Sequence, residues 1–234
     1  MDSSKAITKL SIHKQATSVS ISAEILTIED SSFSNCKYLM SIFVDTKNSQ
    51  FSSIDGILFT KNLETLLCFP AKHPFIKYTI PASVTSIGDF AFSGCRNLQS
   101  LIIPKSVTSI GEFAFARGSS LQSIDVESNN VQYCSINGIL FTKNLEKLLC
   151  VPAKIARSHY TIPTGVTSIG QYAFYRCWKL QSITIPTSVT SICDAAFFGC
   201  SDLQSITIPT SVTSIGDSVF SDCSKLQSIT IPTS

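Results

Sequence analysis

The chain has 234 residues, of which 44% are hydrophobic and 15% are charged, and its formal net charge is +2. This composition provides material for a continuous hydrophobic core and excludes an intrinsically disordered chain. The net charge is too small to predict binding to nucleic acid or to an anionic membrane surface.

The first segment, residues 1–18, matches the rest of the chain poorly, and we interpret it as a degenerate first coil or an N-terminal cap. Its beginning, Met1–Leu10, is polar and lacks the apolar stretch of a secretory signal. The sequence has no run of ~18 apolar residues that would insert into a membrane, and no Asn-x-Ser/Thr glycosylation acceptor. The chain stops within a repeat at Ile231–Ser234, so we expect a piece of a longer protein.

Residues 19–234 consist of a repeated unit of 23 residues, which predicts a solenoid. The unit reads LQSITIPTSVTSIGDxAFxxC. Large apolar residues recur in three columns: Leu39, Leu98, Leu121, Leu180, Leu203 and Leu226; Ile28, Ile87, Ile110, Ile169, Ile192 and Ile215; and Phe33, Phe92, Phe115, Phe174, Phe197 and Phe220. Recurrence within one chain indicates a structural requirement that is copied from unit to unit.

Each unit predicts two short strands and a turn. In L-x-S-I-x-I, alternate residues point inward from a first strand, and the next residue, Pro, ends it because Pro has no N–H for the ladder. V-T-S-I predicts a second inward-facing stretch on the return side. A glycine follows at Gly88, Gly111, Gly170 and Gly216, where we expect a turn with positive φ. The segment D-x-A-F-x-x-C then predicts a short helical turn.

Two longer segments, at about 45–81 and 127–163, match each other at an offset of 82 residues. In the first, Ile54–Phe59 and Thr65–Pro70 are apolar runs on either side of the polar residues 60–62, which predicts a β-hairpin. Gly56 and Gly138 would supply a bend or a bulge. The two hairpins either project from their coils or extend them.

The unit I-P-x-S-V-T-S-I-G-x-x-A-F-x-x-C-x-x-L and the interleaved DGILF…LLCFPA segment resemble the BspA-like subclass of leucine-rich-repeat proteins over about residues 19–234. Ser22, Cys193 and Gly118 depart from the pattern locally. Pattern and resemblance together predict an α/β solenoid: a curved leucine-rich-repeat right-handed superhelix with a parallel β-sheet on one face, short helical turns on the other, and two inserted β-hairpins.

Two polar columns follow the repeat. We expect the recurring cysteines to form a buried column of free thiols, with disulfides between adjacent coils as the alternative: Cys36, Cys95, Cys177, Cys200 and Cys223. The recurring carboxylates are predicted to cap the short helical turns, and a calcium-binding ladder is the alternative: Asp30, Asp89, Glu112, Asp194 and Asp217.

Nothing in the sequence predicts catalysis. We expect His13, His73 and His159 on the surface, because no nucleophile or orienting carboxylate is tied to them by spacing. The chain has no CxxC pair and no phosphate-binding, dinucleotide-binding or zinc-protease motif. A stack of near-identical coils has no converging pocket, so we predict no catalytic residues, no cofactor and no metal.

The outward-facing residues of the first strand are the candidate partner-binding positions. They are Ser41, Phe43, Ser100, Ile102, Ser123, Asp125, Ser182, Thr184, Ser205, Thr207, Ser228 and Thr230. Phe43 and Ile102 are the expected anchors, because binding hot spots are few and usually large. The alternative is that the Ser and Thr rows merely solvate a β face.

The predicted function is a non-catalytic binding solenoid that recognises a protein through this sheet face. The resemblance implies a surface antigen that mediates adhesion to a host-cell or matrix protein, although the chain shows no signal peptide or membrane anchor. An intracellular scaffold is the alternative, because it accounts more simply for free cysteines and absent glycosylation acceptors. The terminal coil at Ser234 also offers a surface for self-association.

Overall fold

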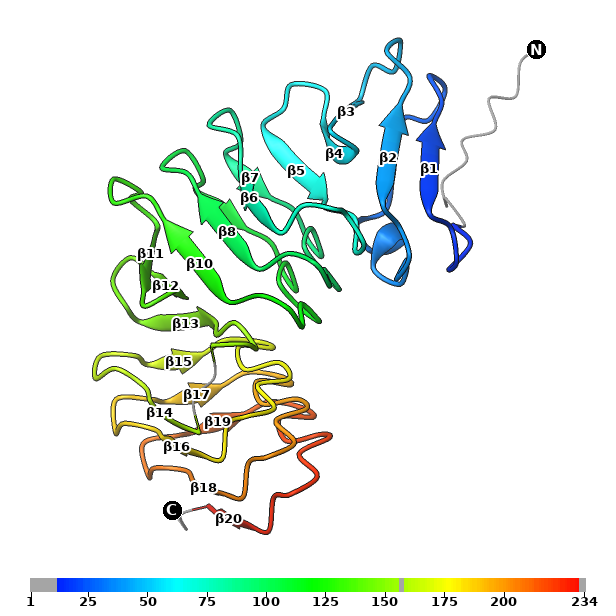
Figure 1. The fold of residues 1–234 in the computed structure, drawn as a ribbon. Helices are drawn as coiled ribbons and strands as arrows, with labels where there is room; N and C mark the ends of the chain where they lie inside the picture. The colour runs from blue at the N-terminus through cyan, green and yellow to red at the C-terminus, as the bar shows by residue number, and fades with distance from the viewer. Residues whose placement is uncertain (1–11, 156–157, 232–234) are drawn as a thin grey trace, which may run out of the picture.

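The computed structural model describes residues 12–155 and 158–231, and these form a β-solenoid of about nine turns (Figure 1). Most of the predicted cap, residues 1–11, lies outside the described residues. The described part begins with strand β1, Ser18–Ile21, which pairs in parallel with β2, Ser41–Val44. The 23-residue unit therefore appears in space as one turn of the coil.

A long strand begins each turn, and together these strands form the long-strand face. Besides β1 and β2 they are β6 (Lys77–Thr79), β8 (Ser100–Ile103), β10 (Ser123–Val126), β14 (His159–Thr161), β16 (Ser182–Thr184), β18 (Ser205–Thr207) and β20 (Ser228–Thr230). They pair in parallel as β1-β2, β6-β8-β10, β14-β16 and β18-β20. Ser100 lies opposite Ser123, one repeat later, so the predicted register is confirmed.

A second set of strands forms the opposite, short-strand face, after a proline turn in the plain coils and after the polar turn of the hairpin in the two inserts. These strands are β5 (Thr65–Cys68), β7 (Ser86–Ile87), β9 (Ser109–Ile110), β13 (Lys147–Cys150), β15 (Ser168–Ile169), β17 (Ser191–Ile192) and β19 (Ser214–Ile215). They pair in parallel as β5-β7-β9 and β13-β15-β17-β19. The V-T-S-I stretches thus form the return strands that the sequence predicts.

The predicted helical turns are wrong for all but the first coil. The described residues contain one helix, the 3-10 helix η1 at Asp30–Phe33. In later coils the N–H groups alternate their partners: Ala91 N–H donates to Gly88 within its own turn (3.2 Å), but Phe92 N–H donates to Ala114 in the next coil (2.8 Å). A helix needs successive bonds within one segment, and bonding to the neighbouring coil prevents this.

The predicted positive φ at the repeat glycine is also wrong. Positive φ occurs two residues later, at Phe90, Phe113, Tyr172, Ala195 and Ser218, and again four residues after that. The glycines are required for space instead. A Cβ on Gly170 would lie 2.7 Å from the Leu148 carbonyl oxygen of the preceding coil. We call this segment of each coil the glycine turn.

Two carboxylates of the recurring column do not cap their own turns. Asp89 Oδ1 accepts from the backbone N–H of Glu112 (2.7 Å), and Asp194 Oδ1 accepts from that of Asp217 (2.8 Å). Asp30 lies in the first turn of η1, the position that the prediction gave it. The predicted capping role is wrong for Asp89 and Asp194, because their carboxylates link each coil to the next.

The predicted hairpins across the polar turns are confirmed, because β4 (Ile57–Thr60) pairs antiparallel with β5 and β12 (Ile139–Thr142) with β13. Each insert also contains a hairpin that was not predicted, β3 (Phe51–Ile54) with β4 and β11 (Tyr133–Ile136) with β12. Gly56 and Gly138 form the bends with φ of 79° and 77°. The hairpins extend the coils rather than project from them. Side chains of β12 alternate between two core clusters, with Leu140 in the preceding one and Phe141 in the following one.

The hairpin coils bend the rod. Each adds antiparallel strands beside β2 or β10, but residues 70–76 and 152–155 replace the glycine turn on the other side. The glycine turns on either side of the second hairpin coil touch directly, with the Phe113 and Tyr172 ring centroids 5.5 Å apart. The solenoid therefore curves with the glycine turns on the inside of the bend (Figure 1).

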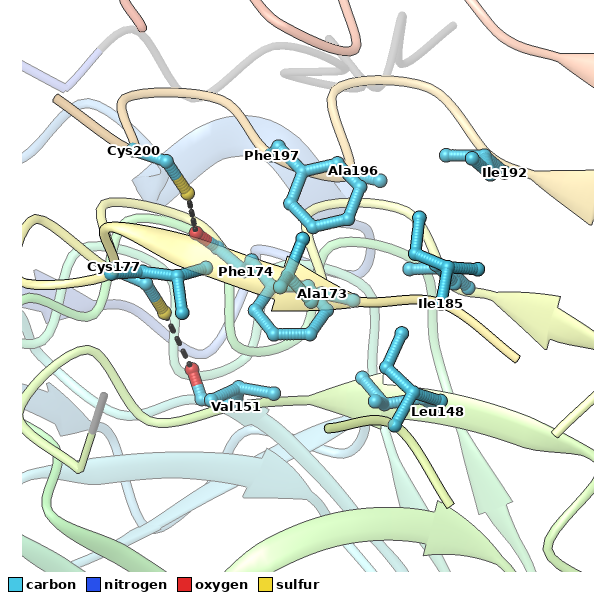
Figure 2. Close-up of a cluster of buried hydrophobic side chains, with 14 of the residues drawn as sticks. Leu148, Val151, Ala173, Phe174, Cys177, Ile185, Ile192, Ala196, Phe197 and Cys200 are labelled. Carbon is cyan, nitrogen blue, oxygen red and sulfur yellow. Dashed lines mark hydrogen bonds between the residues drawn. The ribbon is translucent and has the colours of Figure 1, made fainter. Parts of the chain in front are cut away.

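Like residues stack into columns in the core. Figure 2 shows Phe197 above Phe174, and the centroids of the two rings are 4.8 Å apart. The recurring cysteines are buried with free thiols, as predicted. Each thiol of Cys95, Cys177, Cys200 and Cys223 donates to a carbonyl 26 residues earlier; Cys200 Sγ lies 3.2 Å from the Phe174 oxygen. Burial raises the pKa of the Cys95 and Cys177 thiols well above the usual range.

The one gap in the cysteine column predicts a stabilising substitution. Gly118 replaces the cysteine in its coil, and a cavity of about 10 Å³ lies beside it. A Cβ there would approach Phe115 O at 3.4 Å, an ordinary contact distance. We expect Gly118→Cys to raise the free energy of unfolding by about 1 kcal/mol in urea denaturation. Gly118→Ala is the control; equal gains from both variants would show that the thiol does not fill the cavity.

The buried thiols predict a loss of stability in alkaline solution. Burial raises the pKa of Cys150 to about 12 and that of Cys177 well above the usual range, whereas unfolded cysteines ionise near pH ~8.5. Their contribution is complete below pH ~8 and declines above it, by about 1.4 kcal/mol per pH unit for each thiol. The free energy of unfolding can be measured by urea denaturation in reducing buffer between about pH 8 and 10. For Cys177→Ala it should fall less steeply with pH than for wild type, by the contribution of one thiol. An identical decline in wild type and variant would contradict this.

Candidate interaction surfaces

The predicted partner-binding residues lie together on the long-strand face, but the hairpins divide them into groups. Ser41 and Phe43 are on β2, and the tip of the first hairpin lies next to them, where Gly56 O accepts from Ile42 N–H at 2.8 Å. The others lie on β8, β10, β16, β18 and β20. We call these twelve outward positions the strand strip.

The strand strip has an apolar and a hydroxyl half. Phe43 is 56% exposed and Ile102 is 38% exposed, and Met40, Ile54 and Ile76 are further exposed apolar side chains in the same half. In the C-terminal half the corresponding positions are Thr184, Thr207 and Thr230. The two expected anchors are thus accessible and have apolar neighbours that the sequence pattern did not single out.

Polar side chains connect neighbouring coils along the strip. Ser123 Oγ donates to Ser100 Oγ at 3.1 Å. His159 Nδ1 lies 2.8 Å from Ser182 Oγ, and Thr184 Oγ1 lies 3.4 Å from His159 Nε2. His13 and His159 are exposed, as predicted. The prediction is wrong for His73, which is 2% exposed beneath the first hairpin coil, with Nε2 2.7 Å from the Asp55 carbonyl oxygen.

A second surface lies inside the bend, where side chains of the glycine turns gather. The Phe90 and Phe113 rings are nearly parallel, with 4.8 Å between their centroids. The Phe113 ring also contacts the Tyr172 ring. The rings of Tyr175 and Phe198 stack at 5.6 Å. We define the turn groove as Phe113, Arg117, Tyr172, Tyr175, Arg176 and Phe198. These side chains belong to coils on both sides of the second hairpin.

The turn groove is hollowed. One cavity of about 480 Å³ is lined by Arg117, Tyr172, Tyr175, Arg176 and Phe198. Phe113 and Tyr172 also line a second cavity of about 330 Å³, beside the second hairpin coil. Tyr172 belongs to both cavities, so they adjoin. This region has the concavity that is typical of binding sites, and aromatic rings and cationic side chains together form its walls.

Among the described residues no group of three or more His, Cys, Asp or Glu side chains is arranged to hold a metal ion. None of the helices described is long and apolar enough to cross a membrane. The carboxylate of Glu112 and the ammonium of Lys147 line the smaller cavity, with Gln171 and Thr142. This arrangement includes no Ser or Cys nucleophile beside a histidine base of the kind used in covalent catalysis.

Sequence comparison identifies the repeat. The profile of the BspA type leucine rich repeat region matches residues 12–72, 67–150 and 153–234, in six copies. The chain belongs to the BspA-type leucine-rich-repeat family. No curated protein matches the chain significantly.

Several solved structures resemble the chain in fold. The pneumococcal vaccine antigen PcpA has a TM-score of 0.58 and 22% identity, over 91% of this chain and 50% of that protein. A leucine-rich cell surface protein of Faecalibacterium prausnitzii has a TM-score of 0.53 and 29% identity, over 93% and 48%. A leucine-rich repeat protein of Eubacterium ventriosum has a TM-score of 0.55 and 23% identity, over 93% and 60%. The chain thus spans about half the length of the first two.

Sequence reasoning missed the turn groove. Its residues occupy variable positions of the BspA-type repeat, so a list of recurring residues does not include them. A signal was nevertheless present: the variable position of D-x-A-F holds Phe113 and Tyr172 in the middle coils but Ala195 and Ser218 in later ones. Bulky aromatic residues at one variable position of adjacent coils indicate a surface patch.

Proposed function

We propose that this BspA-type solenoid is a non-catalytic protein-binding module that docks a partner on the N-terminal half of the strand strip. The exposure of Phe43 and Ile102, with Met40, Ile54 and Ile76 exposed in the same half, carries the proposal. Large apolar side chains release the most free energy when a partner covers them. Backbone pairing and hydroxyl contacts already hold the surrounding strands in place, so the docking surface is preformed.

The finer proposal is that the module acts at a cell surface, in adhesion to a host-cell or matrix protein. It is supported by the similarity at 29% identity to a protein described as a leucine rich cell surface protein. An intracellular scaffold is the second candidate. It is favoured by one observation: all nine cysteines have free thiols, which is typical of reducing compartments.

The strip predicts a variant that loses binding but keeps its fold. We expect the double variant Phe43→Thr/Ile102→Thr to capture its partner at least about tenfold more weakly in a pull-down, because two apolar anchors are removed. Thr occupies the corresponding position in later coils, so the thermal unfolding midpoint should change little. The matched control is Thr184→Ser/Thr207→Ser on the hydroxyl half. Equal capture by both double variants would exclude the apolar half as the docking surface.

The compartment is tested separately. Biotinylation of intact source cells with a membrane-impermeant reagent should label the protein if it is displayed at the surface, and Lys37 and Lys225 are exposed amines for the reaction. Labelling only after lysis would contradict the surface role and support the scaffold. A cytoplasmic marker protein serves as the control for cell integrity.

A further inference from the structure

The turn groove carries an inference that does not depend on the strand strip. Four of its side chains lie on residues with positive φ: Phe113 at 57°, Arg117 at 62°, Tyr172 at 54° and Arg176 at 51°. Residues with a Cβ are disfavoured in this left-handed region, and bulky residues there are outliers. Each therefore carries backbone strain. The equivalent residues Phe90, Ala195, Ser218 and Asp222 of other coils share this conformation, so the choice of side chain and not the backbone distinguishes the groove.

Other coils show that the fold does not require these side chains. At the second of the two left-handed positions, Gly94 and Gly199 stand where Arg117 and Arg176 stand in their coils, with φ of 73° and 72°. Glycine adopts this region without steric cost. The repeat thus has a relaxed solution in two coils, whereas Asp222 occupies this position in the last coil with φ of 60°, and the two coils beside the second hairpin use arginine.

The turn groove is also strongly cationic for a chain with so small a net charge. Arg117 and Arg176 line the larger cavity together with Lys37 and Arg96, and Asp222 is the one carboxylate there. In the part of the chain that the structure describes, the only ion pair joins Lys225 to Asp202. The four cations therefore attract an anionic group from outside the chain.

The two arginines are positioned without being neutralised. Arg117 Nη1 donates to Asn35 Oδ1 of the first described coil at 3.2 Å, and Asn35 is an uncharged acceptor. The Arg176 guanidinium lies over the Tyr175 ring, 5.6 Å from its centroid. Each guanidinium keeps further N–H donors, in a fork that matches a carboxylate.

We propose that the turn groove binds an acidic segment of a partner protein, with the segment's carboxylates on Arg117 and Arg176 and its apolar side chains against the aromatic rings. Phe113 and Phe198 have no polar atoms, so they suit apolar side chains better than the hydroxyls of a sugar chain. The cavity of about 480 Å³ is of the size that encloses a few side chains. The groove is thus a second docking surface, inside the bend and separate from the strand strip.

The rim of the groove continues the same chemistry. Trp178 is exposed and lines a cavity together with Arg176. The ammonium groups of Lys154 and Lys179 lie 5.5 Å and 4.9 Å from the Trp178 ring centroid. An extended acidic segment that leaves the groove on this side meets a further aromatic ring with two cations.

The test uses a fluorescein-labelled peptide of Glu, Leu and Phe residues and measures fluorescence anisotropy with the full chain. The variant Arg117→Gly/Arg176→Gly copies the relaxed coils. It should bind the peptide at least about tenfold more weakly, because it loses two charge-assisted contacts. Its thermal unfolding midpoint should be equal to or higher than that of wild type, because strain is released. Loss of binding therefore cannot be explained by unfolding.

Three controls decide the outcome. A peptide with Lys in place of Glu should bind poorly, and Arg117→Lys/Arg176→Lys should bind with intermediate affinity because it keeps the charge and loses the fork. The strip variant Phe43→Thr/Ile102→Thr should bind the acidic peptide as wild type does, which separates this inference from the strip. Unchanged affinity in the double-glycine variant, or tighter binding of the polysaccharide heparin than of the peptide, would overturn the proposal.

Discussion

Backbone hydrogen bonding between coils at a fixed separation of about one repeat is the constraint on which this structure depends. It operates on the long-strand face, where Gln122 N–H donates to Gln99 O, on the short-strand face, where Thr190 N–H donates to Thr167 O, and in the glycine turns, where Phe197 N–H donates to Val219 O. Because three sides of the coil are tied in this way, like residues must stack. Apolar, thiol and carboxylate columns then follow from one register.

The stacked core continues through both hairpin coils and ends at the last coil, which has no neighbour to cover it in the described structure. The buried residues fall into three clusters, and strands β4 and β12 join them because each places side chains in two clusters. At the last coil, Ile215 and Ile231 are exposed although most of their equivalents in the interior are buried. A coil therefore gains most of its stability from its neighbours, as one-dimensional repeat proteins do. The hairpin strands are where side chains of one element pack into two core clusters.

The parts that the sequence predicted are those that recur. The burial of Phe92, Phe174 and Phe197 was predictable because the same residue recurs at the same position of each unit. The hairpins were predictable from their duplicated pattern. The glycine turns were not, because D-x-A-F-x-x-C has helical spacing while the N–H groups bond to another coil, a long-range preference that overrides the local one. The strand strip stays a prediction. The turn groove was not predicted, because Phe113 and Tyr172 come into contact only where the second hairpin bends the chain.

The hairpin coils have a consequence for shape. Each is wider at its strands than at its opposite edge, so it acts as a wedge between the coils before and after it. The two wedge-shaped coils are 82 residues apart in the sequence. Adding or removing a plain 23-residue unit between them would lengthen or shorten a limb without altering the angle of either corner. The length of the straight segments and the curvature of the solenoid are therefore set by different coils. Duplication of a plain unit would change the length alone, and so the size of partner that the curved surface fits.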